Sequence, residues 1–309
     1  MTMKLEIIKW NDLTEDEKIT SIQRPTLNSL KGQDSTITQI FKDVRADGDE
    51  ALKKFTSIYD GVKIDDFLMS EKEIESAFSR VPRDLIQSIE NAIENIKTFH
   101  EKNFENDLNP VEVKSGINCQ IIKRPIEKVG LYIPAGNNPL PSTAIMLGVP
   151  SSLARNKQSV VVSPPNDLGV VNDAVTVAAK LSGIGKIFKV GGAQSIAALA
   201  LGTESIPRVD KIFGPGNSWV TRAKQMISSL NLPVSIDMPA GPTEVMIISD
   251  GNTNPEFIAY DLLSQAEHGI DSQVILISQN DSFLKDVAIE IDIATVSYTH
   301  LTLPTNREV

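Results

Sequence analysis

The chain of 309 residues has a single cysteine, Cys119, and only three histidines. One cysteine excludes an internal disulfide and agrees with a reducing compartment such as the cytoplasm. Three histidines leave few candidates for metal binding. We interpret His100 as a solvated residue at a helix end, and His300 lies in an unusual C-terminal segment. Only His268 has other candidate ligands beside it.

Long hydrophobic runs and an excess of positive charge are also lacking. No stretch reaches the roughly 18 apolar residues of a membrane span. The N-terminus lacks the apolar core of a signal peptide, so we expect a cytoplasmic protein. The formal charge is −10 and the pI is about 4.9. Nucleic acids are bound by clustered Lys and Arg, so this charge argues against them and favours a small-molecule ligand.

The first part of the chain has the pattern of helices. In "STITQIFKDVRADGDEALKKFTSIYDG" apolar residues recur at helical spacing, and Gly48 is expected to interrupt the helix. Ser70 and Glu73 fit a capping box, and a long amphipathic helix is expected after Pro82. We predict a helical region over residues 1–110.

From residue 111 the pattern changes to short β-rich runs. "VEVKSGINCQIIKRP" predicts a hairpin around Gly116. Helical patterns then separate most of the runs "KVGLYIP", "SVVVSPP", "KIFKV", "VDKIF", "EVMIIS" and "QVILIS". Apolar strands spaced by helices indicate a parallel sheet covered on both faces. The predicted class is α/β, a helical N-terminal arm followed by an α/β body with segments at 111–236 and 237–295.

Three glycine-rich loops follow predicted strands and lead into predicted helices: "LYIPAGNNPLPSTA", "KVGGAQSIAA" and "KIFGPGNSWV". Ligand sites of open α/β sheets form at the carboxyl ends of strands, and helix N-termini suit phosphate or another anion. None of the loops has the G-x-G-x-x-G fingerprint, and each alone could be a plain turn with a helix cap. A fourth loop, "IDMPAGPTEV", presents Thr243 just before a strand.

The stretch "DLLSQAEHGIDSQVILIS" places Gln265 and His268 three residues apart at a helix end. Their side chains can reach one point, and an amide oxygen and a neutral imidazole can both bind a divalent metal. Two ligands are not a site, because zinc takes about four, and a capping histidine stays an alternative. A hydrolase of the H-E-x-x-H type is excluded, because the second helical histidine is missing.

Four long blocks together carry a family resemblance: "VGLYIPAG", "VGGAQSIAALALGTESIPRVDKIFGPGNSWVTRAK", "IDMPAGPTEV" and "LLSQAEHGIDSQVIL". They closely resemble the histidinol dehydrogenases, over about residues 36–290. The resemblance implies incomplete Rossmann-like domains, a homodimer and one zinc ion per subunit. It also implies NAD-dependent oxidation of L-histidinol to L-histidine, through the aldehyde, as the last steps of histidine biosynthesis.

The resemblance also assigns roles to residues. Tyr132, Gln194 and Asn217 fall on the family's NAD contacts. Thr243 falls on a substrate contact. Gln265 and His268 fall on both zinc and substrate contacts.

The departures from the family concern the C-terminal end. The family's acid–base Glu–His pair and its other zinc ligands, an aspartate and a second histidine, lie beyond the matched residues, so the catalytic residues stay unknown. We expect an incomplete fragment that binds zinc poorly and does not turn over histidinol. "VSYTHLTLPTNREV" matches nothing in the family, and we expect a non-native tail over 296–309.

Two alternative functions stay open at this point. One is a related dehydrogenase of another polar amino alcohol or diol, and the other is a non-catalytic nucleotide- or metal-binding module. The sequence does not separate NAD from NADP.

Overall fold

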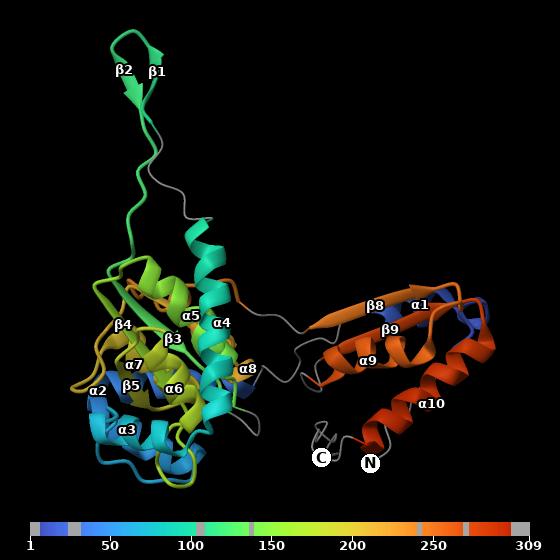
Figure 1. Ribbon diagram of the computed structural model, residues 1–309, viewed down its shortest axis with the longest axis horizontal. Helices are drawn as coiled ribbons and strands as arrows, with labels where there is room; N and C mark the ends of the chain where they lie inside the picture. Colours follow the sequence, from blue (N-terminus) through green and yellow to red (C-terminus); the bar gives the residue numbers. More distant parts are fainter. Residues whose placement is uncertain are drawn as a thin grey trace. The chain divides into compact units, whose positions relative to one another are not determined.

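The chain forms two separate compact units. The computed structural model describes residues 7–23, 32–102, 109–135, 139–239, 243–267 and 272–297. The large unit is Ser29–Ala240, and the small unit joins Met1–Asn28 to Gly241–Val309 (Figure 1). The predicted helical region 1–110 therefore contributes to both units.

A parallel sheet forms the centre of the large unit. Its strands lie in the order β5-β4-β3-β6-β7. Their bounds are β3 Lys128–Tyr132, β4 Gln158–Ser163, β5 Lys186–Lys189, β6 Lys211–Phe213 and β7 Ser235–Ile236. Gly130 of β3 is paired with Val160 of β4 and with Ile212 of β6. The order therefore reverses beside β3: β4 and β5 are added on one side, and β6 and β7 on the other.

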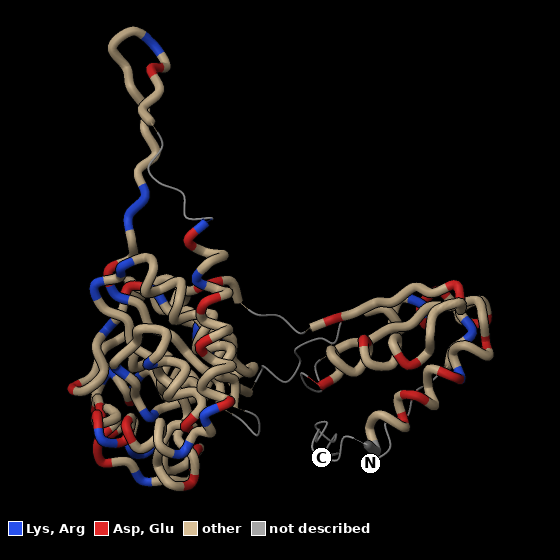
Figure 2. Tube along the Cα trace, viewed as in Figure 1, with Lys and Arg blue, Asp and Glu red and all other residues tan. Residues whose placement is uncertain are grey.

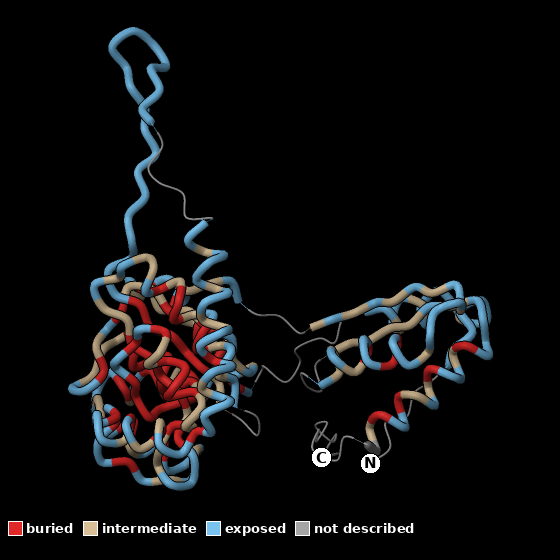
Figure 3. Tube along the Cα trace, in the orientation of Figure 1, coloured by how far each residue is buried: buried red, intermediate tan, exposed pale blue. Residues whose placement is uncertain are grey.

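Helices cover both faces of this sheet, as predicted (Figure 1). One face packs against α2 Gln33–Tyr59, α7 Gly192–Leu201 and α8 Ser218–Ser229. The other packs against α3 Glu71–Arg80, α4 Arg83–Lys102, α5 Pro141–Leu153 and α6 Asp173–Leu181. Successive strand residues alternate between the two cores: Val160 and Val162 face the first, and Val161 faces the second. The buried residues gather at these two interfaces (Figure 3).

The helix signals in the sequence are confirmed. Ser70 Oγ accepts the Glu73 N–H at 3.2 Å, and the Glu73 carboxylate accepts the Ser70 N–H at 2.7 Å. Gly48 has a φ of 52° and kinks α2. The carboxylate of Glu204 accepts the N–H of Asp49 directly after the kink, at 2.7 Å.

The predicted hairpin is formed by β1 Val111–Lys114 and β2 Ile117–Cys119, with Gly116 in the turn at a φ of 79°. Every residue from 109 to 128 is exposed (Figure 3). The hairpin therefore adds nothing to the core of the large unit in this chain.

The small unit has its own parallel pair of strands, β8 Glu244–Ser249 and β9 Gln273–Ser278. The helices α9 Pro255–Ala266 and α10 Asp281–Ser297 pack against one face of that pair. The N-terminal residues contribute the short helix η1 Trp10–Asp12 and α1 Glu15–Ile22. Among the described residues, no helix is long and apolar enough to cross a membrane.

Candidate functional site

The reversal of strand order beside β3 marks the edge where a ligand is expected to bind. In open α/β sheets, ligands lie outside the carboxyl ends of the strands at such a switch point. Here the switch point lies between Tyr132, the last residue of β3, and Gly214, which follows β6. Gly214 has a φ of 124°, and a Cβ atom there would overlap the carbonyl oxygen of Tyr132. Only glycine fits this close approach of two backbones.

A buried lysine and a half-buried aspartate hold the loop after β6 in place. Lys224 of α8 is only 3% exposed, and its ammonium donates to the Gly214 carbonyl at 2.9 Å and to the carboxylate of Asp237. The other carboxylate oxygen of Asp237 accepts the Gly214 N–H at 2.8 Å. Asp237 directly follows β7. One ion pair therefore ties the loop to both α8 and β7.

Asn217 begins α8 at this edge. Its side-chain oxygen accepts the N–H of Val220 at 3.1 Å, so Asn217 is the N-cap of this helix. Asn217 is exposed, unlike the other two residues assigned to cofactor contacts. A helix N-terminus that opens to solvent suits an anionic group of a ligand.

Tyr132 is almost fully buried, with 3% of its surface exposed. Its hydroxyl is hydrogen-bonded to the backbone N–H of Gly192, the first residue of α7, and burial raises the pKa of Tyr132 to about 12. The hydroxyl therefore stays protonated and already occupies one of the free N–H groups that the sequence predicted for this helix N-terminus.

Gln194 lies in the same helix turn and is 1% exposed. Its side-chain nitrogen donates to the carboxylate of Asp60 at 3.4 Å. Gly192 has a φ of 61°, and a Cβ atom there would lie 2.6 Å from the side-chain oxygen of Gln194. Tyr132 and Gln194 thus meet around Gly192, whereas Asn217 lies on the loop that follows β6.

Asp60 is a residue of this network that the sequence did not indicate. It follows the last residue of α2 and is partly buried. Desolvation raises the pKa of its carboxyl to about 6. The available signal was weak: an acidic residue before Gly61 at the end of a helix pattern is usually a helix cap or a turn.

In the small unit, the structure brings together two of the predicted residues. The Thr243 hydroxyl donates a hydrogen bond to the side-chain oxygen of Gln265, in the last turn of α9. Asn254 caps the start of α9 by accepting the N–H of Glu256 at 3.1 Å. His268 lies outside the described residues, as does most of the predicted tail with His300.

The described part of the chain does not by itself make a zinc site. Within it, no group of three or more His, Cys, Asp and Glu side chains is placed to hold a metal ion. Thr243 and Gln265 offer a hydroxyl and an amide oxygen, which are hydrogen-bonded to each other. Zinc takes about four ligands and prefers nitrogen, thiolate and carboxylate.

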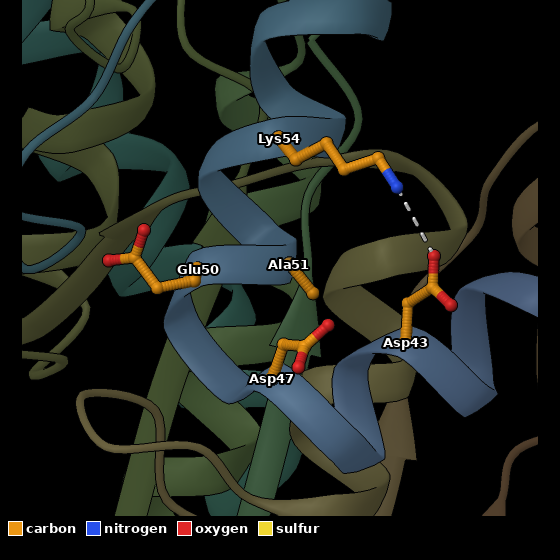
Figure 4. Close-up of a pocket in the computed structure, with 5 residues that line it drawn as sticks. All are labelled: Asp43, Asp47, Glu50, Ala51 and Lys54. Carbon is orange, nitrogen blue, oxygen red and sulfur yellow. Dashed lines mark hydrogen bonds and ion pairs between the residues drawn. The ribbon is translucent and has the colours of Figure 1, made fainter.

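A hollow of about 330 Å³ lies on the outer side of α2, beside the kink at Gly48, and Asp43, Asp47, Glu50, Ala51 and Lys54 line it (Figure 4). Lys54 points toward Asp43, 3.5 Å away, and Glu50 points away from both. No predicted site residue lines this hollow. Elsewhere acidic and basic residues are interspersed over both units (Figure 2).

Together, the covered parallel sheet and the loops at its switch point define an α/β protein of the Rossmann-like class. Comparison with known proteins gives the family. The family model for histidinol dehydrogenase matches residues 23–303. The chain is 45% identical over 289 residues to a histidinol dehydrogenase of Xanthomonas campestris pv. campestris (strain 8004), covering 94% of this chain and 67% of that protein. It is 43% identical over 288 residues to that of Mannheimia succiniciproducens, covering 93% and 66%.

A solved structure agrees with these matches. The crystal structure of histidinol dehydrogenase from Elizabethkingia anophelis superposes with a TM-score of 0.84 at 42% identity, over 94% of this chain and 66% of that one. The chain belongs to the histidinol dehydrogenase family of oxidoreductases. It spans about two thirds of the length of these relatives.

Proposed function

We propose that this chain carries the cofactor-binding part of an NAD-dependent histidinol dehydrogenase, which oxidises L-histidinol to L-histidine in histidine biosynthesis. The observation that supports it most is the family relationship, at 45% identity over 94% of the chain. The proposed cofactor residues are Tyr132, Gln194 and Asn217, and the proposed location is the cytoplasm.

The switch-point edge of the large unit fits a dinucleotide. The helix N-termini of α7 and α8 favour the negative charge of a pyrophosphate, and Gly192 and Gly214 keep the backbone free of side chains there. When bound, NAD supplies the hydride acceptor. Asn217 is the exposed contact in this proposal, and Tyr132 shapes the turn at Gly192.

Thr243 and Gln265 are the proposed substrate contacts, with zinc as the proposed metal beside Gln265 and His268. A hydroxyl and an amide oxygen can both accept hydrogen bonds from the amino and hydroxyl groups of an amino alcohol. Gln265 and His268 are two of the roughly four ligands that zinc takes, so we expect weak zinc binding and no turnover by the 309-residue chain.

Isothermal titration calorimetry and an NADH assay test the proposal with the same preparation. We expect NAD to bind and L-histidinol with added zinc to give no NADH. Absence of NAD binding would contradict the cofactor assignment. Turnover near the rate of a longer relative would show that the prediction of an incomplete site is wrong.

The homodimer is also a proposal. The hairpin and the residues directly after it expose a set of aliphatic side chains: Val111, Val113, Ile117, Ile121 and Ile122. A lone two-stranded hairpin is marginally stable in water, so we expect this segment to pack against a partner surface. The partner proposed is a second copy of the chain.

Light scattering coupled to size-exclusion chromatography tests the dimer. We expect the chain to elute as a dimer, and Val113→Lys with Ile122→Lys to shift it toward the monomer. Lys42→Glu on the exposed side of α2 serves as the control and is expected to leave the mass unchanged. A monomeric parent chain contradicts the proposal.

A further inference from the structure

Asp60 lies at the ligand-binding edge of the sheet, although no motif singles it out. Its carboxylate accepts the hydrogen bond from Gln194 at 3.4 Å. Gln194 is in the first turn of α7, which begins at the carboxyl end of β5. The end of α2 and the start of α7 therefore meet at the edge where the loops gather.

The carboxylate of Asp60 has few partners there for hydrogen bonds or ion pairs. Among the residues that the structure describes, no Lys or Arg pairs with it, and burial alone accounts for its raised pKa of about 6. An ionised carboxylate accepts several hydrogen bonds, and Gln194 supplies a single long one. Asp60 thus keeps acceptor capacity for donor groups of a ligand.

Of the three neighbouring residues Asp60, Gln194 and Tyr132, Asp60 is the most exposed to solvent. Gln194 is 1% exposed and Tyr132 is 3% exposed, so neither presents much surface to a ligand. Asp60 is only partly buried. Because an ionised carboxylate can only accept, the side-chain nitrogen of Gln194 faces it, and this hydrogen bond orients the carboxylate of Asp60.

We infer that Asp60 determines cofactor specificity: its carboxylate accepts hydrogen bonds from ribose hydroxyls of a dinucleotide, its charge repels a phosphorylated ribose, and Gln194 is its positioning residue. An acidic residue on the ribose hydroxyls is a general physical basis for preferring NAD to NADP. The inference rests on the proposed function, because it needs a dinucleotide at this edge.

Calorimetric titration of the 309-residue chain with NAD and with NADP tests the inference. At pH 7.5 we expect the parent chain to bind NAD at least about tenfold more tightly than NADP. Asp60→Asn is expected to weaken NAD binding about tenfold and to bring the two affinities close together. Asp47→Asn, which changes an exposed carboxylate on the same helix, is the matched control and is expected to leave both affinities unchanged.

A pH series separates this role from a merely structural one. Tyr132 from β3 and Gln194 from α7 are the groups that interact with Asp60, and Tyr132 stays neutral because its pKa is about 12. NAD affinity of the parent chain is expected to rise with pH through about 6, as Asp60 ionises. Asp60→Asn is expected to remove this rise, and Gln194→Ala to weaken NAD binding less than Asp60→Asn does.

The outcomes are distinguishable. If the parent chain binds neither dinucleotide, the proposed function fails, and the inference with it. If it binds NAD but Asp60→Asn keeps both the preference and the pH dependence, the inference is overturned and the proposed function stands. Circular dichroism checks folding, and Asp60→Asn is expected to be at least as stable as the parent chain.

Discussion

At the scale of single residues, two positions at the switch-point edge of the large unit have features that are unfavourable for the stability of the fold. Asp60 is a partly buried carboxylate without a cationic partner among the described residues. Gly214 adopts a backbone conformation that other residues rarely tolerate. Such costs are typical of sites where the fold is arranged for a ligand.

The first prediction concerns Asp60 and pH. Its folded-state pKa of about 6 lies above the ordinary value of 3.8, so the folded chain holds this proton more tightly than the unfolded chain. The stability that it contributes is full below about pH 3.8 and is lost as the pH rises through about 6. Asp60→Asn should therefore be more stable than the parent chain at pH 7.5, by about 1 kcal/mol once solvent screening is allowed for.

Urea unfolding followed by circular dichroism at pH 7.5 and at pH 4 measures this difference. The advantage of Asp60→Asn should be full at pH 7.5 and should shrink as the pH falls from about 6 to 4. A constant difference, or a loss of stability at pH 7.5, would show that the carboxylate is better neutralised than the structure indicates.

The second prediction concerns Gly214. Gly214→Ala places a Cβ atom against the Tyr132 carbonyl oxygen at a φ of 124°. We expect it to destabilise the large unit by at least about 2 kcal/mol in urea unfolding. Gly32→Ala is the control, because Gly32 has no other atom within 4 Å of the added Cβ and a φ of −87°. Equal effects of the two substitutions would contradict the close approach.

At the scale of elements, local sequence signals predicted much of the fold. The apolar runs became β3, β4, β5, β6, β8 and β9. In the large unit, burial of the sheet on both faces leaves a continuous apolar pattern in the sequence. The capping box at Ser70 and the caps Asn217 and Asn254 set helix starts through neighbouring atoms alone. Such features depend on residues within a few positions of each other, so a sequence reports them.

Features that depend on distant contacts could not be predicted. β7 is only two residues long, and residues 67–69 pair with the edge of β5, where the Lys189 N–H donates to the Phe67 carbonyl at 2.8 Å. In the candidate site, the sequence did not show that Tyr132 and Gln194 are buried, and their assignment as cofactor contacts stays a prediction. Asp60 was missed, because its role arises where the ends of α2 and α7 meet.

The third prediction tests the ion pair that joins β6, β7 and α8. Asp237→Ala removes the carboxylate partner of the Lys224 ammonium, which is 3% exposed and keeps its hydrogen bond to the Gly214 carbonyl. The substitution leaves a buried ammonium without its carboxylate, and we expect this to cost about 3 kcal/mol. Glu127→Ala is the control: its partner Lys157 is exposed, and the loss should be below about 0.5 kcal/mol. Chemical unfolding that gives similar losses for both would contradict the proposed tie.

At the scale of the whole molecule, the small unit has an apolar sheet face that its own helices do not cover. Val245 and Ile247 of β8 pack against α9 and α10, whereas Met246 is 52% exposed and Ile248 is 77% exposed. Parallel sheets are normally covered on both faces. An apolar face of this kind promotes association.

The fourth prediction follows from that face. Met246→Thr with Ile248→Thr should lower light scattering and raise the highest concentration at which the chain does not aggregate. The free energy of unfolding should change little. Thr suits a strand and removes apolar surface. Val245→Thr with Ile247→Thr is the matched control on the covered face, and it should destabilise the small unit. Unchanged scattering in the first variant would show that the exposed face does not drive association.

The fifth prediction concerns the independence of the two units. Each has a hydrophobic core of its own, and the large unit contains all three proposed cofactor residues together with Asp60. Compact units that share no core unfold separately, so calorimetry of the chain should show two transitions. Two substitutions in the full chain assign the transitions. Asp237→Ala should lower the melting temperature of the large unit only, and Leu262→Ala in α9 that of the small unit only.

NAD should raise the melting temperature of the large unit's transition alone, because a ligand stabilises the unit that binds it. One transition that both substitutions shift equally would mean that the units fold as a single body.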